Sequence, residues 1–145
     1  MGYRAEYPEG MRTAVGLVLI AFALVACSTG SAGPAQSASL TVTYWPEGAN
    51  ASTKVKWTLR CGPAGGTLRR PDVACRKLAA GGAKLFARVP QNVACTQIYG
   101  GPQVARVSGI VNGKRVWVTF NRTDGCQIER WNKLAPWLLP RAGVA

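Results

Sequence analysis

The chain has 145 residues, a formal net charge of +12 and 48% hydrophobic residues. We expect one domain with a modest core and no second domain. The sequence has no histidine, which excludes Ser-His-Asp and Cys-His catalytic sites, because these need an imidazole to move a proton at neutral pH.

The N-terminal segment has the pattern of an export signal. Residues 15–25 form an uncharged apolar run, preceded by Arg12 and too short for a comfortable membrane span. The run leads into "LVAC", ending at Cys27, which resembles the box of bacterial lipoproteins, where the cysteine is acylated and becomes the mature N-terminus. We therefore expect a lipoprotein-type signal peptide over residues 1–26, with Met11 as an alternative start. An ordinary signal peptide cleaved nearby is the other interpretation.

A flexible linker is expected over residues 27–37, which are mostly small and polar, and a single domain over residues 38–145. The chain has five cysteines, and an odd number in an exported chain needs an explanation. Acylation of Cys27 would leave two pairs, which we expect to oxidise after export. The four cysteines are Cys61, Cys75, Cys95 and Cys126. Their spacing and the missing histidine argue against zinc, so we expect no metal and no cofactor.

Two half-buried strands come first. In "SLTVTYWP" the apolar Leu40, Val42 and Tyr44 alternate with threonines, and in "KVKWTLR" the residues Val55, Trp57 and Leu59 alternate with polar ones. A helix follows in "PDVACRKLAAGG". It has Pro71 and Asp72 in its first turn and stops at Gly81-Gly82.

A hairpin is predicted over residues 104–120, "VARVSGIVNGKRVWVTF", because Asn112-Gly113 suits the two positive-φ positions of a type I′ turn. One face of its second strand should carry Val116, Val118 and Phe120, and the other Arg115, Trp117 and Thr119. A second helix should begin near Asp124 as N-cap, with Gln127 three residues on, and end before Pro136. Its apolar stripe is Ile128, Trp131 and Leu134. These elements predict an α+β fold with helices on one side of an antiparallel sheet.

Charge gives two alternatives for the surface. After Cys27 there are 16 Lys and Arg residues against 4 acids, a balance that favours contact with polyanions such as phospholipid headgroups. Many of the cations alternate with apolar residues, so a solvated basic strand face is the favoured interpretation. The acids Glu47, Asp72, Asp124 and Glu129 form no visible catalytic pair. We therefore expect that the protein is not an enzyme and that it has no nucleic-acid partner.

The cysteine-rich motifs resemble those of the Streptomyces subtilisin inhibitor family. The chain reads "LRCGPAGGT" over residues 59–67, then Pro71, Ala74-Cys75 and Leu78. It continues with "CTQIY" over residues 95–99, "VNGKR" over residues 111–115, and Cys126. The similarity runs from about residue 40 to about residue 126.

This resemblance implies a five-stranded antiparallel sheet with two helices and the bridges Cys61–Cys75 and Cys95–Cys126. It also implies a substrate-like loop whose scissile bond joins Gln97 and Ile98. Thr96 would then be P2, Cys95 P3 and Ala94 P4, with Ile98 and Tyr99 on the primed side. Gln97 departs from the family, which usually has Met, Lys or Arg there, and "QIERWNKLAPWLLP" replaces a strand-like ending.

The implied function is inhibition of a subtilisin-like or trypsin-like serine protease. A lipid on Cys27 would anchor the protein to the outer face of the cytoplasmic membrane; otherwise it would be secreted. The family resemblance is also compatible with a homodimer of this protein that forms through the sheet. The alternative is a non-inhibitory cell-envelope lipoprotein that binds a partner or polyanion through its basic surface, in which case residues 96–99 are a plain surface linker.

Overall fold

The computed structural model describes residues 37–141. The predicted signal peptide, Cys27 and nearly all of the linker lie outside the described residues. The strands are β1 (Ala38–Trp45), β2 (Val55–Cys61), β3 (Val104–Val111) and β4 (Lys114–Phe120). The helices are α1 (Pro71–Gly81), the 3-10 helix η1 (Gly82–Phe86) and α2 (Gly125–Leu134). No described helix has the length and apolar character needed to cross a membrane.

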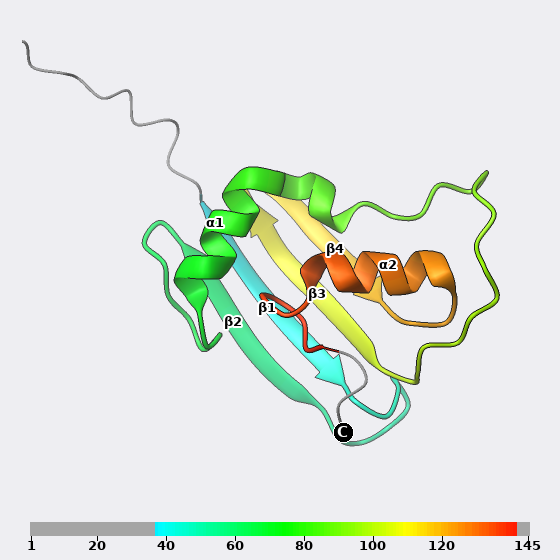
Figure 1. Cartoon of the computed structure of the whole chain (residues 1–145). Coiled ribbons are helices and arrows are strands. Elements are labelled where there is room, and N and C mark those ends of the chain that lie inside the picture. Colours follow the sequence, from blue (N-terminus) through cyan, green and yellow to red (C-terminus); the bar gives the residue numbers. More distant parts are fainter. Residues whose placement is uncertain (1–36, 142–145) are drawn as a thin grey trace, which may run out of the picture. The chain divides into compact units, whose positions relative to one another are not determined.

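The strands form one antiparallel sheet in the order β2-β1-β3-β4 (Figure 1). The predicted hairpin is confirmed: β3 and β4 pair directly, and Asn112 and Gly113 have φ angles of 49° and 76°. These positive values are those that a type I′ turn requires. The α+β class, the antiparallel sheet and the two α-helices are therefore confirmed.

The expected number of strands was wrong, since the sheet has four strands within the described residues and not five. The two longest segments outside the four strands do not form another one. Residues 87–103 contain Pro90 and Pro102, which have no N–H to donate to a ladder, and Gly100-Gly101 between them. After Phe120 the apolar residues recur every three residues, and this segment folds as α2.

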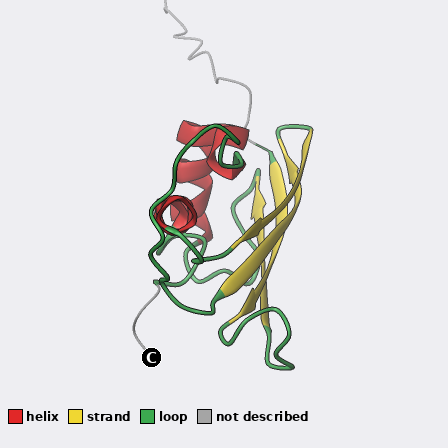
Figure 2. Ribbon diagram, turned by 90° about the vertical axis from the view of Figure 1, so that its right-hand side faces the viewer, coloured by secondary structure: helices red, strands yellow, loops and turns green. Residues whose placement is uncertain are grey.

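One face of the sheet is buried under the helices, and the other is uncovered (Figure 2). Side chains alternate between the two faces, so Leu40, Val42 and Val107 are buried in the core. In β4, Val116 and Phe120 are buried, Val118 is half-buried and the three alternate residues are exposed, as the sequence predicted. The core thus lies entirely on the helix side.

Both helices begin and end as their sequences predict. Helix α1 has Pro71 in its first turn and is followed by Gly82 with a positive φ of 55°. The Asp124 carboxylate caps α2 by accepting a hydrogen bond from Gln127 N at 2.9 Å, which satisfies one of the free N–H groups of the first turn. Trp131 and Leu134 of α2 are fully buried.

The C-terminal apolar segment packs on the domain. Leu138 and Leu139 are buried in the core, and the indole N–H of Trp57 donates to the Leu138 carbonyl at 3.1 Å. The indole N–H of Trp131 donates to the Pro140 carbonyl at 2.9 Å. Within the described residues, the buried core extends from Ala38 to Leu139.

Candidate functional site

The candidate site lies in the long loop of residues 87–103, which joins η1 to β3 and projects away from the sheet (Figure 1). Thr96 and Gln97 at its centre are exposed. Ile98 and Tyr99 are 58% and 66% exposed, although both are large and apolar. Four consecutive side chains are thus presented to solvent, and Cys95 beside them is half-buried.

A disulfide joins this loop to α2. Cys95 is bonded to Cys126 in the first turn of the helix, with the two Cα atoms 5.4 Å apart. The second disulfide, Cys61–Cys75, ties the end of β2 to α1 and lies outside the loop. The Asp124 carboxylate lies within 4.8 Å of the Cys95 and Cys126 sulfurs. Disulfide sulfurs are not thiolates, so this cluster is no metal site.

Two backbone clamps hold the loop on either side of its exposed residues. Gly125 N donates to the Thr96 carbonyl at 2.9 Å, and Gly100 N donates to the Arg122 carbonyl at 2.8 Å. Arg122 Nη1 also donates to the Gly100 carbonyl. The three residues between the clamps, Gln97 to Tyr99, are therefore fixed at both ends by one short segment of chain.

Both clamps involve a glycine whose surroundings leave little room for a side chain. A Cβ atom on Gly125 would lie 2.0 Å from Thr96 Oγ1, and one on Gly100 would lie 2.8 Å from Ile128 Cδ1. Real Cβ atoms essentially never approach other atoms so closely. A side chain at Gly125 would therefore displace Thr96 of the loop, whereas at Gly100 the atoms in the way are the ends of the Ile128 and Arg122 side chains, which can shift at lower cost.

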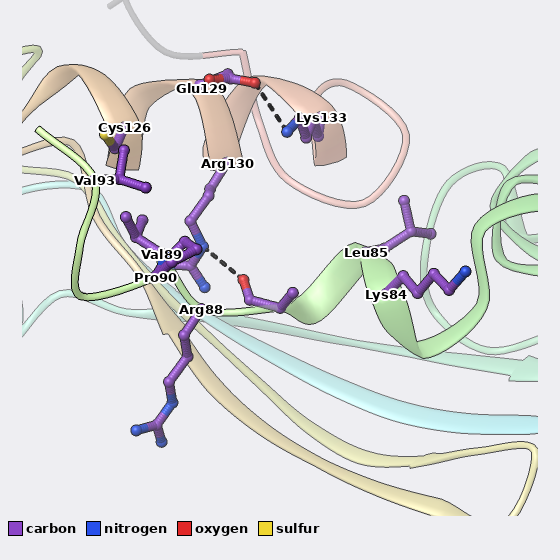
Figure 3. A pocket seen from close by; sticks show the side chains of 11 residues that line it. Lys84, Leu85, Arg88, Val89, Pro90, Val93, Cys126, Glu129, Arg130 and Lys133 are labelled. Atoms are coloured by element: carbon purple, nitrogen blue, oxygen red, sulfur yellow. Dashed lines mark hydrogen bonds and ion pairs between the residues drawn. The ribbon is translucent and has the colours of Figure 1, made fainter. Parts of the chain in front are cut away.

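Arg130 of α2 fixes the start of the loop. Its Nε donates to the Ala87 carbonyl at 2.9 Å and its Nη1 to Gln127 Oε1 at 2.6 Å. Figure 3 shows Arg130 directed from α2 toward the loop, with its bond to the main chain dashed. The guanidinium carbon lies 4.6 Å from the centre of the Phe120 ring, a cation–π contact. Burial lowers the pKa of Arg130, and the neighbouring charge of Arg88 lowers it further.

A small cavity of about 200 Å³ lies behind the loop, between η1, residues 87–93 and α2 (Figure 3). Its one carboxylate, Glu129, is paired with Lys133 at 2.9 Å. The hydrogen bond from Lys133 lowers the pKa of Glu129, which is therefore ionised at neutral pH. With one ionised, paired carboxylate, the cavity lacks the paired acid and base that hydrolysis would need. The disulfide, the two backbone clamps and Arg130 together hold a short peptide segment in fixed geometry.

The charge of Arg122 also acts on the core side of the site. Burial raises the pKa of Tyr44, and the charge of Arg122 opposes this effect. Tyr44 itself packs against Trp57 and Trp131, with both ring centres 6.1 Å away. The charge of the side chain that clamps Gly100 thus influences one ring of this aromatic cluster.

Sequence analysis named the exposed residues but missed the residues that clamp them. Arg122 and Gly125 were not predicted as part of the site. Their position shortly before Cys126 was the available signal, since a Cys95–Cys126 bridge brings this segment next to the loop. The particular N–H and carbonyl groups that meet there depend on the fold.

The comparisons with known proteins give one family. The family model described as "Subtilisin inhibitor-like" matches residues 35–123. The search of curated proteins found no match. Among solved structures, the chain is similar to Streptomyces caespitosus sermetstatin, solved in complex with Bacillus licheniformis subtilisin, at 26% identity and a TM-score of 0.47. That similarity covers 73% of this chain and 99% of the sermetstatin chain.

Proposed function

Because the chain belongs to the subtilisin inhibitor-like family, we propose that it inhibits a subtilisin-like or trypsin-like serine protease by presenting the Gln97–Ile98 bond as a substrate. Members of this family are protease inhibitors and not enzymes. The observation that carries the assignment of the bond is the exposure of Gln97 and Ile98 between two backbone clamps and beside the Cys95–Cys126 disulfide. In this assignment Thr96 is P2, and Ile98 and Tyr99 are on the primed side.

The clamps supply the affinity by ordering the loop in advance. A free peptide that binds a protease cleft loses conformational freedom, at a cost of about 0.5–1.5 kcal/mol for each immobilised, rotamer-rich side chain and more for the backbone. Here the hydrogen bonds at Thr96 and Gly100 restrict the backbone before the protease arrives. Less entropy is lost on binding, so more of the contact energy appears as affinity.

The same clamps favour religation over release. When the protease serine attacks the Gln97 carbonyl carbon, the bond to the Ile98 nitrogen breaks, an ester forms on the serine, and the Ile98 amine takes a proton. Ile98 cannot diffuse away, because Gly100 is hydrogen-bonded to Arg122. The acyl side is held by the hydrogen bond at Thr96 and by the disulfide at Cys95. The amine stays beside the ester, and this proximity favours the reverse reaction.

The side chain of Gln97 affects which protease is bound more than it affects how firmly the loop is held. Its side chain makes only a long contact inside the loop, from Nε2 to the Cys95 carbonyl at 3.5 Å, so the side chain is available to a partner. An uncharged amide fits an S1 pocket that offers hydrogen bonds better than one built around a charge. We therefore expect a protease that accepts polar P1 residues.

The proposed location is the outer face of the cytoplasmic membrane, through a lipid on Cys27. Support comes from the "LVAC" sequence and from the pairing of the other four cysteines with one another, which leaves Cys27 without a disulfide partner in the chain. Mass spectrometry of the mature protein from its host should find an acylated N-terminus at residue 27. An unmodified N-terminus elsewhere would contradict the anchor.

The inhibitory function is tested by titrating subtilisin with residues 28–145 and locating any cut by mass spectrometry. We expect stoichiometric loss of protease activity, with the chain intact or cut only between Gln97 and Ile98 and still bound. The variant Gln97→Glu should weaken inhibition at least tenfold, because a charge must be desolvated in the pocket. Gln91→Glu is the matched control: it makes the same change at another exposed position of the loop and should leave inhibition unchanged. Rapid cleavage with full protease activity would refute the proposal.

A further inference from the structure

A groove lies between helix α1 and the segment that follows α2. One wall is formed by α1 and the residues just before it, and the other by residues 135–137. Its volume of about 390 Å³ is within the range that is usual for ligand sites. The apolar part of the lining includes Leu68, Val73 and Trp137, and the cations are Arg69, Arg70 and Lys77.

No acid lines this groove. Val73 and Lys77 are four residues apart, so they lie on the same side of α1. Asp72 and Arg76 are also four residues apart and form an ion pair with each other at 3.2 Å. The other ion pair of the described residues lies within α2. The three cations of the groove are therefore exposed and have no carboxylate partner in the described part of the chain.

The apolar lining is held in place by the fold. Leu68 and Trp137 are half-buried and pack against the core. The indole N–H of Trp137 donates to the Lys133 carbonyl at 2.9 Å. Because its N–H is already bonded within the protein, the ring contributes apolar surface to the groove. A partner would therefore meet a lining that is ordered before it binds.

The groove continues toward the C-terminal end of the described chain. A second cavity of about 340 Å³ shares Leu68, Arg69 and Pro136 with the first and extends to Pro140, again without a lining acid. Both cavities are open to solvent along their length. The wall made by residues 135–140 lies beyond residues 35–123, which the family model matches.

We propose that this groove binds a segment of another protein in which acidic residues stand next to large apolar ones. The three unpaired cations complement carboxylates in charge, and the apolar lining can bury aliphatic or aromatic side chains. A small molecule would remain largely uncovered in a groove this open, whereas sites for small ligands bury about 70–90% of the ligand surface. A polypeptide laid along the groove uses both cavities.

A second copy of this chain is a poor source of such a segment. The described residues contain four acids. Asp72 and Glu129 are in ion pairs, and Asp124 caps α2. Only Glu47 remains among the described residues, and no acid stands within three residues of it along the chain. The partner is therefore expected to be a different protein.

The groove is remote from the loop of residues 87–103. Figure 1 shows α1 on one side of the molecule and this loop projecting from the other. None of the three cations takes part in the backbone clamps at Thr96 and Gly100. The proposed partner would therefore leave a protease free to reach Gln97 and Ile98, and the inference does not rest on inhibition.

The test is a selection of short linear peptides displayed on phage, with residues 28–145 as bait. This part of the chain contains the whole described core. We expect the enriched peptides to combine Asp or Glu with large apolar residues. A synthetic copy of an enriched peptide is then titrated against the bait, and a second copy with Asn and Gln in place of its acids should bind at least tenfold more weakly.

Two variants locate the binding site. Arg70→Gln with Lys77→Gln removes two exposed cations of the groove and should weaken binding of the acidic peptide about tenfold. Trp137→Ala should also weaken it, and urea unfolding shows whether this variant is folded. The double variant changes no core residue, so its result decides the case even where Trp137→Ala does not fold.

The matched control is Lys84→Gln with Lys114→Gln, which removes the same charge from exposed positions that line neither cavity. It should change binding little. Equal losses in both double variants would mean that net charge alone acts, and would overturn the assignment to the groove. No enrichment, or enriched peptides without acids, would overturn the acidic partner.

Two other results would name a different occupant and overturn the proposal. Heparin binding that Arg70→Gln with Lys77→Gln weakens, in the absence of any enriched peptide, would assign the groove to a polyanion. A dimer in light scattering that the same variant dissociates would assign the groove to a second copy.

Discussion

The two disulfides should contribute similarly to stability and very differently to inhibition. They separate residues by 14 and 31 positions, for Cys61–Cys75 and Cys95–Cys126 respectively. On the chain-entropy model these loops correspond to about 3.0 and about 3.7 kcal/mol of folding free energy. The two losses differ by less than 1 kcal/mol. Only the second bridge touches the loop that carries Gln97 and Ile98.

Replacing each bridge by a pair of alanines tests this difference. Urea unfolding should place both variants about 3–4 kcal/mol below the wild type. Inhibition of subtilisin is then measured where both variants are still folded. We expect the Cys61→Ala, Cys75→Ala variant to inhibit nearly as well as the wild type, because the clamps at Thr96 and Gly100 are untouched.

The Cys95→Ala, Cys126→Ala variant should behave as a substrate under the same conditions. Its loop keeps the backbone hydrogen bonds but loses its covalent tie to α2, so the cut ends separate faster than they religate. Mass spectrometry should show turnover at Gln97–Ile98 with recovery of protease activity. The reasoning fails if this folded variant inhibits as tightly as the wild type, or if both variants lose inhibition to the same extent.

Three further predictions follow from the packing. Gly125→Ala should weaken inhibition at least tenfold, because the added methyl group displaces the loop at Thr96. Stability should stay within about 1 kcal/mol of the wild type, because alanine favours the helix by up to about 1 kcal/mol. Adding Thr96→Ala, which removes the clashing oxygen, should restore inhibition in the same assay. The pKa of Tyr44 is raised above 10.0, so its contribution to the free energy of unfolding is present below pH 10 and is lost as the pH rises through the raised value. In urea unfolding, Tyr44→Phe should therefore lose less of its free energy of unfolding at alkaline pH than the wild type does. An identical loss in both proteins would contradict this. Trp131→Ala should cost about 3–5 kcal/mol in urea unfolding, because the indole is fully buried, and a loss below 1 kcal/mol would contradict the core assignment.

The sequence predicts the elements well where local patterns carry the information. The alternation of apolar and polar residues in "SLTVTYWP" determines which side chains of the strand face the core. Asn112-Gly113 determines the hairpin turn, because both residues accept a positive φ. Asp124 marks the start of α2 for a similarly local reason, because its carboxylate satisfies an N–H three residues on. Such signals involve residues close in sequence, so they do not depend on the rest of the fold.

The sequence predicts poorly what depends on contacts between distant residues. The clamp from Gly125 to Thr96 joins positions 29 residues apart, and no local pattern states that the two backbones approach so closely. The burial of Leu138 follows from its packing beside Trp57, 81 positions away. The fifth strand was expected by analogy, and it fails because the prolines of residues 87–103 and the helical spacing after Phe120 oppose pairing.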